Sequence, residues 1–278
     1  MAPSFGRSIS FPISPARSKP RGAAACHVRS ISLPCRSHPL LSRLQSHIAA
    51  VRSWLVQDQD PSSAFAGLAH IHALHDALAE LLLLPDPQDT LRRATAAADR
   101  LLDAFLLLAD AHQGFREAIL ALSQDVSEAR AALRRGDATR LASAVRSQRR
   151  AEKELSRLAS TVSAGTATKY ARLGLGASAE ETEMAVALME AASASAAASA
   201  AVFSAAASMS SAAASSCKKT PAFAGFAKKA TPETAEMAVD KFEELEQFIV
   251  ECESSCHKVF RSIVHTRVAL LNIQTPTN

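Results

Sequence analysis

Two uninterrupted stripes of mostly apolar side chains constrain the fold of this chain more than any other feature. In residues 87–134, and again in residues 232–273, the stripe residues recur in alternating steps of three and four, the spacing of one helix face. The first stripe is Leu91, Ala94, Ala98, Leu101, Phe105, Leu108, His112, Phe115, Ile119, Leu122, Val126, Ala129 and Leu133. The second is Ala238, Phe242, Leu245, Ile249, Cys252, Cys256, Val259, Ile263, Thr266, Leu270 and Ile273. At 1.5 Å per residue these helices would be about 72 and 63 Å long.

Neither stripe can remain in water, because burying one Leu, Ile or Phe side chain contributes about 1.5–3 kcal/mol. We therefore predict that the two long helices pack on each other as antiparallel, coiled-coil-like partners. Shorter helices would complete an all-α, elongated helical bundle. A homodimer that uses the same stripes is the alternative.

Shorter helices are predicted at residues 39–57, 61–84, 137–163 and 178–217, with loops near 164–177 and 218–231. Asp–Pro pairs at 60–61 and 86–87 each offer a capping carboxylate followed by a proline at the first helical position. Gly136 should end the first long helix and Asp137 should cap the next one, while Ser178 with Glu181 matches a capping box. These signals predict a helical domain at 37–273 between a tail at 1–36 and a short tail at 274–278.

One predicted helix is unusual because its 27 residues from Ala191 to Cys217 carry no charge and include 14 Ala and nine Ser. The stretch is long enough to cross a bilayer. Its hydroxyls and its scarcity of large apolar side chains make insertion barely favourable. We therefore predict a helix whose small residues allow close contact with its neighbours.

The N-terminal segment differs in charge from the rest of the chain. Residues 1–57 hold eight Lys or Arg and no acid, since Asp58 is the first, which leaves 23 basic against 27 acidic residues afterwards. Residues 1–36 are rich in Pro, Ser and Arg and are expected to be disordered. Five scattered cysteines indicate reduced thiols and a cytoplasmic location. The basic, acid-free composition also fits a chloroplast or mitochondrial transit peptide, or the targeting segment of a membrane-peripheral protein.

A hexapeptide occurs twice in this segment, as Arg7-Ser8-Ile9-Ser10-Phe11-Pro12 and as Arg29-Ser30-Ile31-Ser32-Leu33-Pro34. Each copy has an Arg three residues before its second Ser and a Pro two residues after it. This pattern suits a basophilic kinase and then a 14-3-3-type phosphoserine reader. The predicted partner motif is therefore Arg7, Ser10, Pro12, Arg29, Ser32 and Pro34. Ser10 and Ser32 are 22 positions apart, and as a coil this segment would span about 26 Å, so one dimeric reader could engage both. A chance repeat is the alternative.

The sequence offers little evidence of a catalytic or cofactor-binding motif. The chain has no Gly-x-Ser-x-Gly, and Gly174-Leu175-Gly176 lacks both the third glycine and the preceding strand of a dinucleotide site. We predict a protein that is not an enzyme and has no cofactor.

Two clusters resemble metal sites. Cys252 and Cys256 share the apolar stripe while His257 turns away, so buried core thiols are the preferred interpretation over zinc ligands. His70, His72 and His75 are accompanied only by Asp76 and Glu80 as further possible ligands, and structural histidines are preferred there.

A run of basic residues could bind phosphates or anionic lipid. It consists of Arg134, Arg135, Arg140, Arg146, Arg149, Arg150, Lys153 and Arg157. Acidic residues interrupt it and no aromatic residues offer base stacking, so a solvated helix face without a nucleic-acid partner is predicted.

Several segments resemble the plant-specific family catalogued as domain of unknown function 241, which is related to the BYPASS proteins. They are residues 27–39, Trp54, residues 81–85, residues 132–135, residues 259–261 and residues 266–273, and the resemblance spans most of residues 27–273. It implies a helical plant protein without known enzymatic activity, associated with root and shoot development. The first hexapeptide copy and the Ala/Ser tract depart from the family, so Ser32 is the more secure of the two predicted phosphoserines.

Overall fold

Seven helices make up the described part of the chain. A computed structural model describes residues 38–57, 63–167, 179–217 and 232–275, all within the unit Leu33–Asn278. The helices are α1 (Pro39–Val56), α2 (Ala64–Leu81), α3 (Pro85–Arg93), α4 (Thr95–Arg135), α5 (Ala138–Ala167), α6 (Ala179–Cys217) and α7 (Pro232–Gln274). No strand occurs among these residues, which confirms the all-α prediction. The predicted tail, the loop at 218–231, most of the loop at 164–177 and the capping signals at 60–61 and at Ser178 lie outside the described residues.

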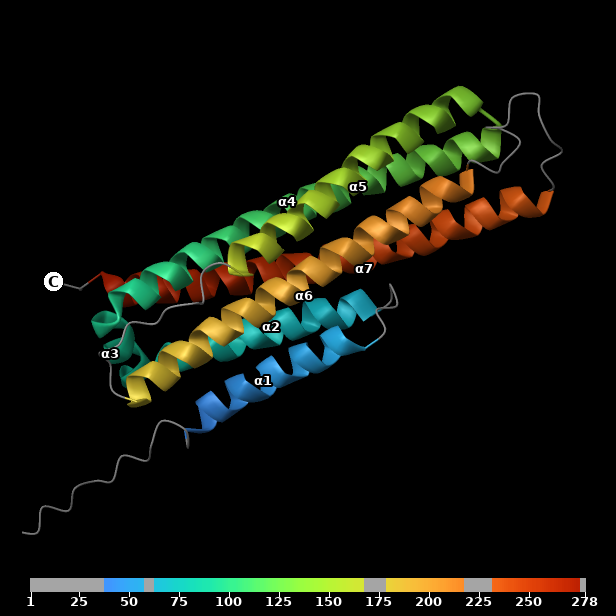
Figure 1. Cartoon of the computed structure of the whole chain (residues 1–278). Helices are drawn as coiled ribbons and strands as arrows, with labels where there is room; N and C mark the ends of the chain where they lie inside the picture. The colour runs from blue at the N-terminus through green and yellow to red at the C-terminus, as the bar shows by residue number, and fades with distance from the viewer. Residues whose placement is uncertain (1–37, 58–62, 168–178, 218–231, 276–278) are drawn as a thin grey trace, which may run out of the picture. The chain divides into compact units, whose positions relative to one another are not determined.

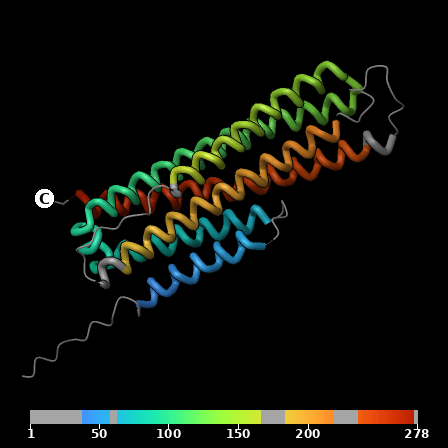
Figure 2. The backbone as a smooth tube through the Cα atoms, in the orientation of Figure 1, coloured from blue at the N-terminus to red at the C-terminus, as the bar shows by residue number. Residues whose placement is uncertain are grey.

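The long helices are arranged as three neighbouring pairs (Figure 1). The α6–α7 pair lies between the α4–α5 pair and the α1–α2 pair: α6 contacts α5, α2 and α1, and α7 contacts α4 and α2. Figure 2 shows that α4 and α7 run in opposite directions, as do α5 and α6. One continuous apolar core therefore joins helices from both ends of the sequence.

The two striped helices pack on each other as predicted. The guanidinium of Arg130 in α4 lies 2.8 Å from Glu243 near the start of α7. The side-chain amide of Gln274, at the end of α7, donates to the backbone carbonyl of Leu91, just before α4. The first contact joins the end of α4 to the start of α7, and the second joins the end of α7 to the residues just before α4, so the two helices are antiparallel. Most stripe residues on both helices are buried.

The prediction of one continuous helix over 87–134 is wrong at its start. The chain forms a separate helix, α3, and breaks at Ala94 (φ −93°, ψ 57°) before α4 begins. Helix α3 starts at Pro85, with Leu84 as its N-cap, rather than at the predicted 86–87 pair. The break lets α3 contact the last turn of α7, where Arg92 donates to the carbonyl of Ile273 at 3.4 Å. Alanine is a strong helix former and the stripe continues through it, so neither signal revealed the break.

The turn between α4 and α5 confirms two sequence signals. Gly136 ends α4 in the left-handed conformation (φ 66°), which glycine adopts without a steric penalty. The carboxylate of Asp137 then accepts a hydrogen bond from the backbone N–H of Arg140 at 3.0 Å. Helix α5 continues to Ala167, four residues beyond the predicted end.

Helix α6 is the Ala/Ser-rich helix, and it is packed on several sides. It contacts α1, α2, α3, α4, α5 and α7. Among the described helices it is long and apolar enough to cross a membrane, but 72% of its apolar window is buried inside the bundle. Small side chains are required where so many neighbours approach, which explains the composition and confirms the predicted close packing.

A close approach at Gly67 in α2 completes the packing beside α6. A Cβ atom at this position would lie 2.5 Å from Cη2 of Trp54 and 2.9 Å from a methyl carbon of Val202. The indole N–H of Trp54 donates to the carbonyl of Ser63, which holds α1 against the start of α2. Glycine at 67 therefore allows α1, α2 and α6 to meet.

Candidate functional site

The predicted partner motif cannot be placed in the structure. Arg7, Ser10, Pro12, Arg29, Ser32 and Pro34 all lie outside the described residues, so the motif remains a prediction. The structure does describe the histidines, cysteines and basic residues that the sequence singled out.

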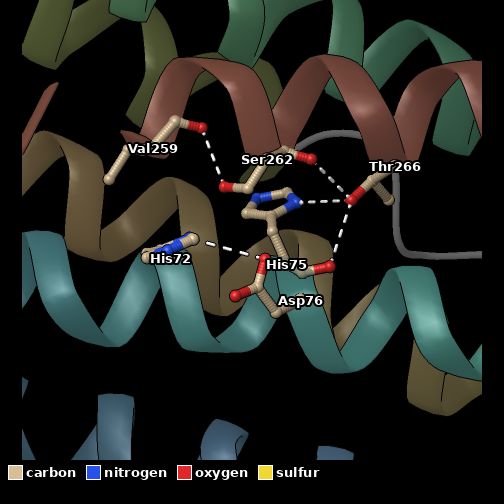
Figure 3. A network of polar contacts seen from close by, with 6 residues as sticks. All are labelled: His72, His75, Asp76, Val259, Ser262 and Thr266. Carbon is tan, nitrogen blue, oxygen red and sulfur yellow. Dashed lines mark hydrogen bonds and ion pairs between the residues drawn. The ribbon is translucent and has the colours of Figure 1, made fainter. Parts of the chain in front are cut away.

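A buried polar network centres on His75 of α2, which is fully enclosed between α6 and α7. Its Nδ1 atom lies 3.2 Å from the hydroxyl of Thr266, and its Nε2 atom lies 2.9 Å from the hydroxyl of Ser195. Figure 3 shows Thr266 bridging the imidazole and the backbone carbonyls of His75 and Ser262. One histidine thus joins three helices.

The hydrogen-bond partners fix the tautomer of His75. Thr266 directs its hydroxyl proton to the carbonyls of Ser262 (3.0 Å) and His75 (3.3 Å), so it accepts from the Nδ1–H of the imidazole. The unprotonated Nε2 then accepts from Ser195. Both ring nitrogens of neutral His75 have a hydrogen-bond partner. Protonation of Nε2 would place an N–H donor opposite the Ser195 hydroxyl, which donates to that atom in the neutral form.

A second buried histidine, His112 of α4, makes an equivalent contact one turn along α6. Its Nε2 lies 2.9 Å from the hydroxyl of Ser199, which itself donates to the carbonyl of Ser195 at 2.8 Å. Ser199 therefore accepts from the Nε2–H of His112. The Nδ1 atom of His112 is buried without a hydrogen-bond partner.

Burial holds both histidines in the neutral form. Desolvation lowers the pKa of His75 and of His112 to about 3, and the proximity of His112 contributes to the lowering at His75. Neither side chain is exposed to solvent, so neither can exchange a proton with an external substrate in this structure. The network is suited to positioning helices rather than to acid–base chemistry.

Three residues on one face of α6 contact the two buried histidines and their neighbours. Ser195, Ser199 and Phe203 are spaced four residues apart and so share one helix face. The ring of Phe203 stacks on Phe115 at 4.5 Å and meets the His112 imidazole edge-on at 5.2 Å. Neither serine was predicted as a site residue, because both lie in the Ala/Ser-rich stretch. Their four-residue spacing relative to Phe203 is the signal in the sequence that marks them.

The cysteines of α7 confirm the core assignment. Cys252 and Cys256 are buried free thiols, and His257 is exposed. A hydrogen bond with Cys256 and burial both raise the pKa of the Cys252 thiol. Burial likewise raises the pKa of Cys217 in α6 to about 11. Such thiols behave as small apolar side chains.

The remaining predicted clusters lie at the surface. His70 and His72 are half-buried, and His72 approaches the carboxylate of Asp76 at 3.5 Å. Within the described ranges, no group of three or more His, Cys, Asp or Glu is arranged to hold a metal ion. All eight residues of the basic run are exposed, and Arg157 pairs with Glu154 at 2.5 Å.

The family of the chain follows from its comparison with known proteins. A family model described as Protein BPS1 matches residues 67–273, about three quarters of the chain. The chain belongs to the BPS1 family. The match begins in α2 and ends in the last turn of α7, so it includes both striped helices and the whole buried network. No curated protein and no solved structure matches the chain.

Membership of the BPS1 family confirms the resemblance to the BYPASS-related family and indicates a plant regulatory role. The BPS1 family is not a known enzyme family, and the fold is all-helical. The buried network belongs to the part of the chain that the family model covers, whereas both hexapeptides precede it.

Proposed function

We propose that this BPS1-family chain is a non-enzymatic regulatory adaptor whose N-terminal serines, once phosphorylated, recruit a dimeric 14-3-3-type protein. The observation that carries the proposal is the repeated hexapeptide, in which Ser10 and Ser32 each follow an Arg by three residues and precede a Pro by two. A phosphate on each serine adds about two negative charges and three acceptor oxygens, which a cluster of arginines on the reader can bind.

The helical bundle supports an adaptor role. Among the described residues, His75 and His112 are enclosed in the core, the three cysteines of α6 and α7 are buried, and the surface is largely polar helix. Two phosphoserines on one chain would bind a dimeric reader with avidity, because the second binding event is intramolecular. The proposal includes a cytoplasmic location and, through the family resemblance, a role in root and shoot development.

The test uses the full chain phosphorylated by a basophilic kinase and mixed with a 14-3-3 protein. Binding measured by titration calorimetry should disappear in the double variant Ser10→Ala with Ser32→Ala. The matched control is Ser8→Ala with Ser30→Ala, which changes the other serine of each copy and should bind normally. Equal affinity of the phosphorylated and unphosphorylated chain would refute the proposal.

A second candidate function rests on the charge of residues 1–57, with eight basic residues and no acid. In this alternative the segment is a targeting sequence, and the protein is a structural component that is imported into an organelle or lies at a membrane surface. A fluorescent protein fused to residues 1–57 separates the two proposals. Plastid fluorescence would favour import, whereas a diffuse cytoplasmic signal that depends on Ser32 favours recruitment of a reader.

A further inference from the structure

An open groove on the surface between α2 and α7 has a basic lining that the proposed function does not use. Its volume is about 610 Å³. Helix α2 contributes His72 and Asp76, and α7 contributes His257, Lys258, Arg261 and His265. The size is that of a small-molecule site.

The cations of the groove have no carboxylate partner. Some basic side chains elsewhere in the bundle pair with an acid three residues away, as Lys241 does with Glu244 at 2.6 Å and Arg157 does with Glu154. No acidic residue stands three or four positions from Lys258 or Arg261 in α7. Within the described ranges neither of these two side chains has an ion-pair partner, and both are exposed. The single acid of the groove, Asp76, lies beside His72.

The floor and wall of the groove are pre-formed. Ser262 is 7% exposed, and its hydroxyl donates to the carbonyl of Val259 at 2.9 Å. Its carbonyl accepts from Thr266, which in turn contacts His75 (Figure 3), so the floor is tied to the buried network. Phe260 and Val264 add apolar surface, and the guanidinium of Arg116 covers the Phe260 ring at 5.6 Å.

This combination of groups selects an anion rather than a metal. Guanidinium and imidazole N–H groups donate hydrogen bonds, the Lys258 ammonium adds a point charge, and the apolar wall can contact an aliphatic or aromatic group. A dianionic phosphate uses two cations and several donors better than a carboxylate does. We propose that the α2–α7 groove is a binding site for a phosphate monoester with a small apolar moiety, held by Lys258 and Arg261.

The test measures binding of phenyl phosphate to the full chain by titration calorimetry at low salt, with benzoate as the carboxylate comparison. A parallel arm measures co-sedimentation with phosphatidylcholine vesicles that contain phosphatidic acid, which presents the same phosphate monoester on a lipid. The groove variant is Lys258→Gln with Arg261→Gln. The matched control is Arg149→Gln with Lys153→Gln, which removes the same charge from the exposed face of α5.

Affinity for phenyl phosphate or for the vesicles should fall at least tenfold in the groove variant and stay unchanged in the control. The arm that responds identifies the source of the phosphate. Absence of saturable binding in both arms would overturn the proposal, as would an equal loss in the two variants, which would indicate non-specific charge attraction. Benzoate binding as tight as phenyl phosphate binding would overturn the assignment to phosphate.

Discussion

The two buried histidines predict how the stability of the bundle depends on pH. Folded His75 and His112 have a pKa of about 3, whereas an unfolded histidine has its ordinary value near 6.5. Between these values the unfolded chain binds more protons than the folded chain. The free energy of unfolding therefore falls as the pH is lowered through this window, and the contribution is fully present above pH 6.5.

The size of the effect follows from the unfolded-state value alone. A pH of 5 lies about 1.5 units below the pKa of an unfolded histidine. At 1.36 kcal/mol per unit, protonation then stabilises the unfolded chain by about 2 kcal/mol. A folded pKa near 3 leaves the buried side chain neutral at that pH. Acidification from pH 7 to pH 5 should therefore cost about 2 kcal/mol for each histidine and about 4 kcal/mol for the pair.

The assay compares urea unfolding, followed by circular dichroism, at pH 7 and pH 5. Carboxylates also titrate in this range, so the informative quantity is the difference between variants. His112→Leu should lose about 2 kcal/mol less than the wild type on acidification. The control is Gln148→Leu, which removes a buried polar side chain that also hydrogen-bonds α6, at the carbonyl of Ser210, but does not titrate.

An unchanged pH dependence in His112→Leu would refute the reasoning, because it would mean that the histidine is protonated in the folded bundle. His112→Gln provides the same comparison with a polar side chain of similar size. A reduced pH dependence in Gln148→Leu would also count against the argument, since that side chain carries no proton to exchange.

Four further predictions concern packing and burial. Gly67→Ala should destabilise the fold by about 1–3 kcal/mol and alter Trp54 fluorescence, since the new Cβ meets the indole. Gly114→Ala should be neutral or stabilising by up to about 1 kcal/mol, because its Cβ would lie 3.2 Å from a movable Leu158 methyl. Ala196→Leu, at a fully buried position of α6, should lower the urea midpoint far more than Ala197→Leu at the exposed next position; equal shifts would contradict the packing of α6. Iodoacetamide at pH 8 should modify Cys252 only after unfolding, as peptide mass spectrometry would show, and rapid native labelling would contradict its burial.

The periodic parts of the fold were predictable from the sequence. The alternating steps of three and four identified the α4–α7 pairing, because a single apolar stripe requires a partner of similar length. Gly136 and Asp137 marked the α4–α5 turn through local backbone chemistry that does not depend on distant contacts.

The features that could not be predicted from the sequence all depend on tertiary contacts. The break at Ala94 follows from the docking of α3 on the end of α7, which no local propensity records. The His75 and His112 network needs residues from four helices, and the sequence gives no distances between them. The α2–α7 groove likewise depends on placing His72 beside a turn of α7 nearly 190 positions later.

The repetitive composition of α6 has a consequence for how the helices find their axial alignment. Where alanine follows alanine, sliding the helix by one turn exchanges one methyl group for another and changes the contact energy little. Ser195, Ser199 and Phe203 interrupt this degeneracy, since a one-turn slip of α6 would leave one of the two imidazoles without its serine hydroxyl and would separate the stacked phenyl rings. The polar contacts in the core thus select one alignment among near-equivalent ones, much as a single buried polar residue sets the register of a coiled coil.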